Sequence, residues 1–400
     1  MSTQLTIDLS SKEYKLNPWP IYEQLRREAP VLHVPGGTWA GEDMFVLSRY
    51  EDVRRALRDK ASFSSRIRRD DFMNLPMLVN RDAPEHTRLR KLTNQAFNAR
   101  LVLTLGTWVQ AVIDDLVTDL LSRERAELVD AYTTALPLRV VGGMLGIPLD
   151  RKADLRRWSQ AVMNSFAVAA GMDPDLVPGF FEDIVEFGNY MSELAHSRQG
   201  APGQPDILGS LVDQHESGTL GWDELVTLAW SFVAAGHETT MNLLGGGLHL
   251  MITEPALRER LTREPALIPE FAEEYLRMYA PTQWLLRRAS TDIEIDGVAI
   301  PEGALVHVLL GSANRDPLRW KDPDVFDLDR PEKEQHMAFG AGPHFCPGAG
   351  LSRLLAERTF RTFLPILDRF RLDPDDPPQL RTQQGSYGFT RIPVSVVPTA

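Results

Sequence analysis

Long amphipathic helical patterns restrict the folds open to this chain more than any other feature. In Leu101–Arg123, apolar residues recur at spacings of three and four from Leu105 to Leu120, which is typical of a helix with one buried face. The longest such pattern is Trp222–Thr253. The other expected helices are Pro18–Glu28, Tyr50–Arg58, Glu85–Phe97, Arg151–Ala170, Pro174–Ser197, Pro265–Met278 and Gly348–Arg369. These patterns predict a mostly α protein.

Strand patterns are short and few. Ile293–Ile295 and Val298–Pro301 flank an Asp-Gly pair, which predicts a β-hairpin. We expect Ala304–Leu309 to extend that small sheet. Val31–His33 and Met44–Leu47 are expected to form an N-terminal strand pair. The predicted fold class is therefore mostly α with small β-sheets at the edge.

Residues 1–400 are expected to form one domain. Glycine and proline occur as short interruptions between helical patterns, and the most flexible stretch, Gln199–Pro205, is typical of a surface loop. The polar N-terminus, Met1–Ser11, lacks the apolar segment of a signal peptide, and no apolar run approaches the length of a membrane span. We therefore expect a soluble, cytoplasmic protein.

The charge balance disfavours two classes of partner. The chain has 43 Lys and Arg against 55 Asp and Glu, a formal net charge of −12. A surface this acidic repels phosphate backbones and anionic lipids, so we expect neither a nucleic-acid nor a membrane partner.

One cysteine, Cys346, lies in a glycine-rich loop before a predicted helix. A single cysteine excludes an intramolecular disulfide and any multi-cysteine zinc or iron–sulfur site. The helix N-terminus is expected to favour the thiolate form of this residue. A buried apolar thiol and a catalytic nucleophile are alternatives, but haem iron is a cofactor that takes one protein thiolate.

The loop resembles the haem-binding signature of the cytochrome P450 family, Phe-Gly-x-Gly-x-His-x-Cys-x-Gly. The matching residues are Phe339, Gly340, Gly342, His344, Cys346 and Gly348. The resemblance implies haem b held between a long distal helix and a proximal cysteine loop, with Cys346 as the iron ligand. Phe339, Gly340 and Gly348 are then cofactor-binding residues. Pro347 departs from the more usual Leu or Ile, and its missing N–H is expected to lower the haem potential.

The longest helical pattern contains a second segment similar to this family, the Ala-Gly-x-Glu-Thr motif of the distal helix. The matching residues are Ala235, Gly236, Glu238 and Thr239. The resemblance implies that Thr239 hydrogen-bonds oxygen at the iron and that Glu238 is the acid of a proton relay. His237 is expected to be solvated or structurally bonded rather than a metal ligand.

Two further sets of charged residues follow from the resemblance. Glu274 and Arg277 correspond to a buried Glu-x-x-Arg pair, which Arg330 is expected to join as a structural group. Haem propionates need cationic or hydrogen-bonding partners. The implied clamp is His86, Arg90, Arg287 and His344, with Arg288 as the competitor of Arg287.

The expected substrate pocket is apolar. The segments implied to line it are Phe72–Val79, positions near Met163 and Phe166, Val233-Ala234, Trp284–Leu286 and Tyr387–Phe389. No flavin or nicotinamide fingerprint is present, so electrons are expected from a ferredoxin and its reductase. A basic patch that would receive the ferredoxin is expected from Arg88, Lys91, Arg100 and Arg353.

The sequence thus indicates a haem-thiolate monooxygenase that uses O2 to hydroxylate or epoxidise a hydrophobic, natural-product-like molecule. One alternative keeps the haem site but performs oxidative coupling, desaturation or peroxygenase chemistry. Another is a non-catalytic haem-binding recruitment protein. The intact Glu238-Thr239 pair disfavours both a purely peroxide-driven enzyme and a mere binder.

Overall fold

The computed structural model describes residue 7 and residues 11–37, 41–67, 77–97, 99–169, 173–201, 206–382 and 385–397. The α-helices are α1 (Lys12–Leu16), α2 (Trp19–Glu28), α3 (Tyr50–Arg58), α4 (Glu85–Ala96), α5 (Ala99–Leu121), α6 (Ala135–Met144), α7 (Lys152–Ala169), α8 (Phe180–His196), α9 (Ile207–Glu216), α10 (Trp222–Thr253), α11 (Pro255–Arg263), α12 (Ile268–Tyr279), α13 (Leu310–Ala313) and α14 (Ala349–Phe363). The strands are β1 (Val31–Val34), β2 (Met44–Leu47), β3 (Phe63–Ser64), β4 (Arg125–Glu127), β5 (Trp284–Ala289), β6 (Ile293–Ile295), β7 (Val298–Ile300), β8 (Leu305–Leu309), β9 (Phe370–Leu372), β10 (Gln379–Leu380), β11 (Phe389–Arg391) and β12 (Pro393–Val396). The predicted mostly α architecture with small sheets is confirmed.

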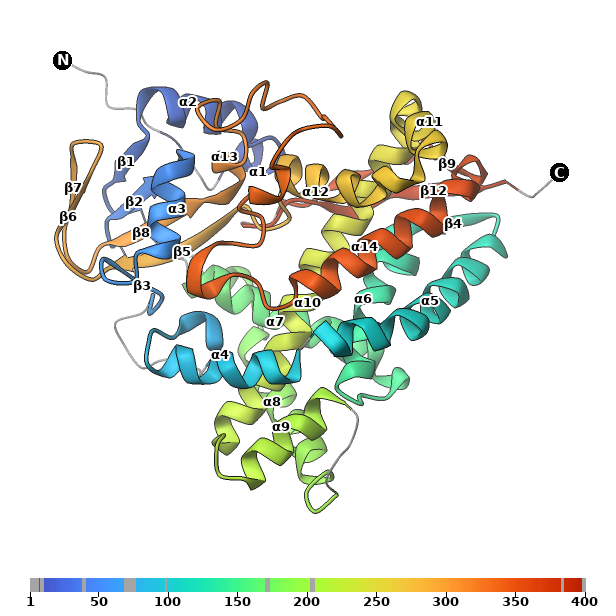
Figure 1. The fold of residues 1–400 in the computed structure, drawn as a ribbon, viewed down its shortest axis with the longest axis horizontal. Coiled ribbons are helices and arrows are strands. Elements are labelled where there is room, and N and C mark those ends of the chain that lie inside the picture. Colours follow the sequence, from blue (N-terminus) through green and yellow to red (C-terminus); the bar gives the residue numbers. More distant parts are fainter. Residues whose placement is uncertain are drawn as a thin grey trace.

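The central element is α10, which runs through the helical part of the molecule, while the five-stranded sheet lies to one side with α2 and α3 (Figure 1). The N-terminus of α10 is capped by the Glu224 carboxylate, which accepts a 2.9 Å hydrogen bond from the Gly221 N–H. Close packing explains two glycines in its second half. A Cβ at Gly246 would lie 1.5 Å from the Tyr275 hydroxyl, and one at Gly247 would lie 2.3 Å from the Phe360 ring. The helices α12 and α14 therefore pack directly on the α10 backbone.

The five-stranded sheet corrects one strand prediction. Its order is β1-β2-β8-β5-β3, and β8 pairs with β2 and β5 rather than extending the β6–β7 hairpin. The hairpin itself and the β1–β2 pair are as predicted. β8 is buried along its whole length, so its sequence does not distinguish a central strand from a neighbour of the hairpin.

The helix boundaries differ from prediction where glycine or proline interrupts a pattern. The segment predicted as one helix from Pro174 to Ser197 is a 3-10 turn followed by α8, with a left-handed residue, Gly179 (φ 79°), between them. After α14, a 3-10 turn with Pro365 near its start takes the place of the predicted last helical turns.

Some elements had no periodic signal. Helix α6 was not predicted because most of its residues are buried, so its own apolar residues do not form a single stripe.

Of the expected surface loop, residues 202–205 lie outside the described residues. Among the helices that the structure describes, none combines the length and apolar character needed to cross a membrane.

Candidate functional site

The cysteine loop is folded back on itself before α14. The Cys346 N–H donates to the Phe339 carbonyl at 2.9 Å, and the Phe345 N–H donates to the Gly342 carbonyl at 3.1 Å. Both Gly340 and Gly342 have positive φ, 68° and 69°. A Cβ at Gly342 would also lie 2.8 Å from the Leu57 carbonyl oxygen. Gly340 and Gly342 are therefore required by backbone conformation, and Gly342 also by its contact with α3.

The Cys346 sulfur meets two opposing effects. Burial raises the pKa of the thiol above its ordinary value. The N–H groups of Gly348 and Ala349 and the charges of Arg90 and Arg353 act in the opposite direction. The N–H groups at the helix N-terminus thus favour the thiolate as expected, but burial has the larger effect on the pKa. A cation bound to the sulfur would favour the thiolate further, and an iron ligand fits this position.

The middle of α10 carries a solvent-accessible strip. Ala235 is exposed and Thr239 is half-buried, although most residues of this helix are buried. The Thr239 hydroxyl donates to the Ala235 carbonyl at 2.9 Å, a bond that competes with the regular helical ladder. The adjacent position is tightly packed, since a Cβ at Gly236 would lie 3.0 Å from Val141. The predicted motif thus combines accessible residues with a glycine that packs closely on α6.

The two acid–base candidates of this motif point in different directions. Glu238 is buried, with 3% of its surface exposed, and its carboxylate contacts the C-terminal segment rather than Thr239. His237 is also buried and shares a 2.9 Å hydrogen bond with the Ser159 hydroxyl through Nδ1. Burial lowers the pKa of His237 to about 3. The hydrogen bond to Ser159 agrees with the expectation that His237 is structurally bonded.

The four residues of the expected propionate clamp lie together. The rings of His86 and His344 are 4.0 Å apart, and Ser65 shares a 3.0 Å hydrogen bond with His344 Nε2. Burial, and then the charges of His86, Arg287 and Arg90, lower the pKa of His344 to about 3. The cluster therefore concentrates positive potential in a buried place.

Arg287 is the most informative member of the cluster. It is 4% exposed, and burial lowers its pKa to about 10. Nη1 donates to the Leu286 carbonyl at 2.7 Å, whereas Nη2 has no hydrogen-bond partner among the described residues, and neither has His86 Nε2. Buried donors of this kind fit the carboxylates of a haem. Arg288 instead donates to the Ile67 carbonyl and pairs with Glu42, so it is not part of the cluster.

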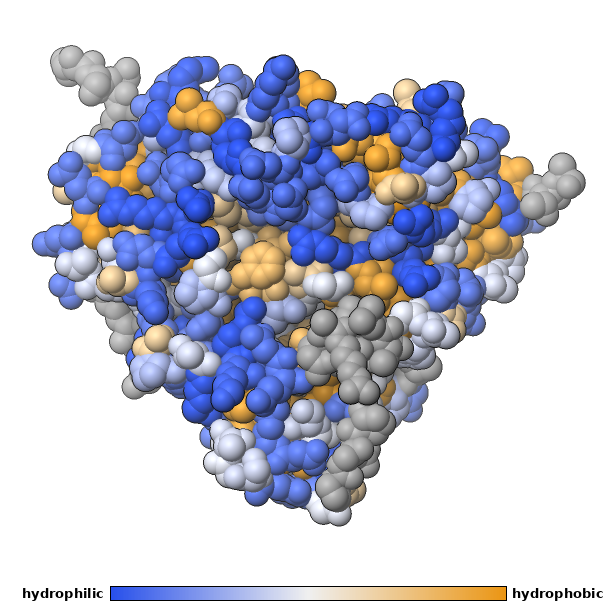
Figure 2. All heavy atoms as spheres, viewed as in Figure 1, coloured by the Kyte–Doolittle hydropathy of each residue, from blue (hydrophilic) through white to orange (hydrophobic). Residues whose placement is uncertain are grey.

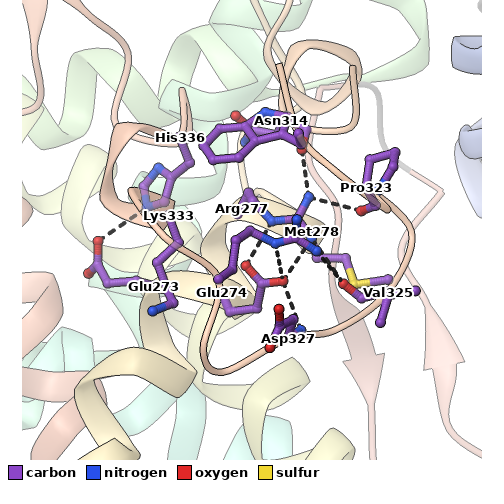
Figure 3. A network of polar contacts seen from close by, with 12 residues as sticks. Glu273, Glu274, Arg277, Met278, Asn314, Pro323, Val325, Asp327, Lys333 and His336 are labelled. Carbon is purple, nitrogen blue, oxygen red and sulfur yellow. Dashed lines mark hydrogen bonds and ion pairs between the residues drawn. The ribbon is translucent and has the colours of Figure 1, made fainter. Parts of the chain in front are cut away.

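Before the cysteine loop, Glu274 pairs with Arg277 (Figure 3) and also with Arg330. Arg277 donates to both carboxylate oxygens at 2.7 and 2.8 Å, and Arg330 donates at 3.0 Å. Arg277 also donates to the carbonyls of Asn314 and Pro323 at 2.7 and 2.9 Å. The predicted partnership of Glu274, Arg277 and Arg330 is confirmed, and it ties α12 to the chain that leads into the cysteine loop.

A second carboxylate next to this network was not predicted. Glu273 accepts hydrogen bonds from Arg353 at 2.7 and 2.9 Å and lies 3.4 Å from His336. Burial alone would raise the pKa of Glu273, but Arg353 and His336 outweigh it and lower the pKa to about 2. Arg353 also lies over the Phe339 ring, 4.8 Å from its centre. Nothing in the local sequence around Glu273 signals contacts this distant.

The expected basic patch is only partly available. Arg88 is paired with Glu224, and Arg353 is paired with Glu273. Lys91 is exposed, and the side chain of Arg100 lies outside the described residues. Beside the buried sulfur, Phe345 is 39% exposed and Pro347 is exposed. The same face carries mostly hydrophilic residues, with apolar residues in separate patches (Figure 2).

The segments expected to line the substrate pocket differ in burial and in their contacts. Val233 and Ala234 are buried on α10, and Met163 on α7 is half-buried. Tyr387 packs against Trp19 and stacks on Tyr279, so the C-terminal turn contributes to an aromatic core there. Residues 72–76 and the side chain of residue 166 lie outside the described residues.

Comparisons with known proteins agree with these features. The family model described as "Cytochrome P450" matches residues 186–397. The chain is 35% identical to cytochrome P450 107B1 of Saccharopolyspora erythraea over 88% of both chains. It is 31% identical to the 6-deoxyerythronolide B hydroxylase of the same organism, over 92% of this chain and 94% of that one. The solved structure of the Bacillus subtilis bacillaene polyketide synthase cytochrome P450 PksS superposes with a TM-score of 0.87 at 28% identity, covering 98% of this chain and 100% of that chain.

Proposed function

Because this chain belongs to the cytochrome P450 family of haem monooxygenases, we propose that it inserts one oxygen atom from O2 into a hydrophobic, natural-product-like molecule by hydroxylation or epoxidation. The proposed cofactor is haem b, and the proposed electron source is a ferredoxin with its reductase. We further propose that residues 1–400 form one catalytic domain that acts in the cytoplasm. Bound haem supplies the centre at which O2 is activated.

The observation that carries the proposal is the cluster of Arg90, Arg287, His86 and His344 near Cys346, in which two arginines lie beside two histidines. The charge of Arg90 acts on both the Cys346 thiol and His344, so the sulfur and the cluster lie close together. The unpartnered donors of Arg287 and His86 suit two propionates, and the Cys346 sulfur would be the protein ligand of the iron. Phe339, Gly340 and Gly348 shape the loop that presents the sulfur.

On the oxygen side, the chain supplies an accessible strip and two proton-carrying groups. Ala235 lies on the accessible strip of α10, where the Thr239 hydroxyl would be available to donate a hydrogen bond to an oxygen ligand, and Gly236 lets the helix pack closely on Val141. Glu238, which is 3% exposed and therefore shielded from bulk water, would hold and release a proton at its carboxylate. This pair supports oxygenase chemistry over the alternatives of peroxide-driven oxidation and a non-catalytic haem-binding protein.

The apolar segments next to α10 support a hydrophobic substrate. Two relatives support a natural-product class, because one is named a 6-deoxyerythronolide B hydroxylase and another is a polyketide synthase cytochrome P450. For the ferredoxin, we propose docking over Phe345 and Pro347, where a bound partner lies next to the sulfur. The paired state of Arg88 and Arg353 limits their contribution to electrostatic steering.

Two spectroscopic measurements and one turnover test this proposal. The reduced holoprotein with carbon monoxide should show a Soret band displaced well to the red, as a thiolate ligand requires. Titration with a library of hydrophobic metabolites should convert low-spin iron to high-spin iron, and the ligand found should gain one labelled oxygen from ¹⁸O₂ when a ferredoxin system supplies electrons. A spectrum typical of histidine-ligated haem, or a product without label, would overturn the proposal.

A further inference from the structure

The Glu238 carboxylate is bound by the C-terminal segment rather than by its own helix. Ser386 donates a hydrogen bond to Glu238 Oε1 at 2.5 Å, and Arg381 lies 3.8 Å from Oε2. Ser386 is 8% exposed and Glu238 is 3% exposed, so this contact is shielded from bulk water. Each carboxylate oxygen therefore has a partner from the chain between β10 and β11.

The position of the Ser386 hydroxyl is set by its neighbours. Gly385 accepts a hydrogen bond from the Gln283 N–H at 2.8 Å, and the Tyr387 N–H donates to the Pro281 carbonyl at 3.0 Å. Ser386 itself forms an antiparallel bridge with Thr282. The serine is thus held between two anchored residues, and its hydroxyl has a fixed place against Glu238.

A second observation on the same face of α10 points to bound water. Asn242 lies four residues after Glu238, which places both side chains on one face of the helix. It is 1% exposed, and neither of its amide atoms has a hydrogen-bond partner among the described residues. A Cβ at Gly388 would lie 2.3 Å from Asn242 Oδ1, so the amide lies directly against the C-terminal turn. A buried amide in this state normally holds an ordered water.

We propose that Ser386 is the proton relay that supplies Glu238, with a water held by Asn242 as part of the route and Arg381 as a positioning residue for the carboxylate. In the transfer, the Ser386 hydroxyl gives its proton to Glu238 and takes one from a neighbouring water, which is protonated in turn from bulk solvent, so both the serine and the water end unchanged. Protons then enter the site from the turn between β10 and β11. This inference rests on the proposed function of Glu238.

The test compares Ser386→Ala with Ser386→Thr in the holoprotein. The alanine variant should lower the product formed per NADPH by about tenfold and change the solvent isotope effect on turnover. That loss is below the 10²–10⁴ typical of a general acid because water can partly replace the hydroxyl. The threonine variant keeps a hydroxyl and should recover most of the coupling. An unaffected Ser386→Ala, or a Ser386→Thr as uncoupled as the alanine variant, overturns the relay.

Two further variants separate the possible failures. Ser395→Ala removes a hydroxyl from β12, whose partner is the Arg371 carbonyl, and should leave coupling unchanged. Glu238→Gln should uncouple turnover; if it does and Ser386→Ala does not, the relay is wrong while the proposed function stands. If Glu238→Gln is as coupled as wild type, the assumed role of Glu238 is wrong.

A readout independent of turnover tests the contact itself. Urea denaturation of the single and double variants at positions 238 and 386 should show non-additive midpoints, because the two side chains share one hydrogen bond. Additive midpoints would show that the contact is absent in solution and would overturn the inference. The carbon monoxide spectrum of each variant verifies that haem is retained.

Discussion

Replacing Glu274 by Gln should destabilise the protein severely. The Glu274 carboxylate accepts four hydrogen bonds, two from Arg277, one from Arg330 and one from the Asp327 N–H at 3.0 Å. The Glu274 and Arg277 side chains are 0% exposed and that of Arg330 is 5% exposed. Glutamine keeps the shape of the side chain but removes the only charge that neutralises two buried guanidinium groups in this contact.

The size of the effect follows from the burial of the pair. Removing one partner of a buried ion pair costs about 3–5 kcal/mol, because the remaining charge stays buried without compensation. The individual hydrogen bonds are not added to this figure, since they are part of the same interaction. Against a total stability of about 5–15 kcal/mol for a folded domain, the loss is a large fraction.

Equilibrium urea denaturation of the holoprotein, followed by tryptophan fluorescence, measures this loss. Glu264→Gln is the matched control, because Glu264 pairs with Arg260 at 3.8 Å and its side chain is 53% exposed. The control should be indistinguishable from wild type. A Glu274→Gln variant whose free energy of unfolding falls by less than about 1 kcal/mol would refute this prediction, because two buried guanidinium groups without a counter-charge should destabilise the protein by more than that.

Three other variants test the site. Thr239→Ala should keep substrate binding but release electrons as hydrogen peroxide; matched NADPH consumption and product formation would contradict the role of its hydroxyl. Pro347→Leu should raise the haem reduction potential, because it restores an N–H near the Cys346 sulfur; an unchanged or lower potential in spectroelectrochemistry would refute this. The third variant is Glu273→Gln. Burial raises the pKa of Glu273, but Arg353 and His336 lower it to about 2 from 4.5. The stabilisation is therefore present above pH 4.5 and lost as the pH falls toward 2. The variant should lose less stability than wild type between pH 5 and pH 3 in urea denaturation; equal losses would contradict the assignment.

The sequence predicted the local elements of this molecule well where a pattern repeats along one segment. The bounds of α3 and α10 agree with the predictions. Helix α3 has an apolar face next to a polar one, and α10 ends just before a clear stop signal, Pro255. The prediction failed for β8 because strand partners are chosen by distant segments. β2 and β8 are parallel neighbours separated by more than half of the chain, and no local pattern in either strand encodes that pairing.

The site was predictable to the extent that its chemistry is concentrated in short motifs. The glycines that the motif places around Cys346 have structural reasons, positive φ at Gly340 and a close approach at Gly342. The choice between Arg287 and Arg288 needed the structure, since adjacent residues of a strand point to opposite faces. Arg287 lies among the histidines, and Arg288 binds Ile67 and Glu42.

The sequence motif does not predict the direction of the Glu238 side chain. Adjacent residues of a helix are separated by about 100° around its axis, so Glu238 and Thr239 cannot share one environment even though the motif places them together. Thr239 lies along the accessible strip, whereas Glu238 meets Ser386 from the C-terminal turn. Proton transfer between them therefore requires either a rotation of the Glu238 side chain or intervening water. Both requirements depend on the turn that holds the carboxylate, and a serine 148 positions away carries no sequence signal of that contact.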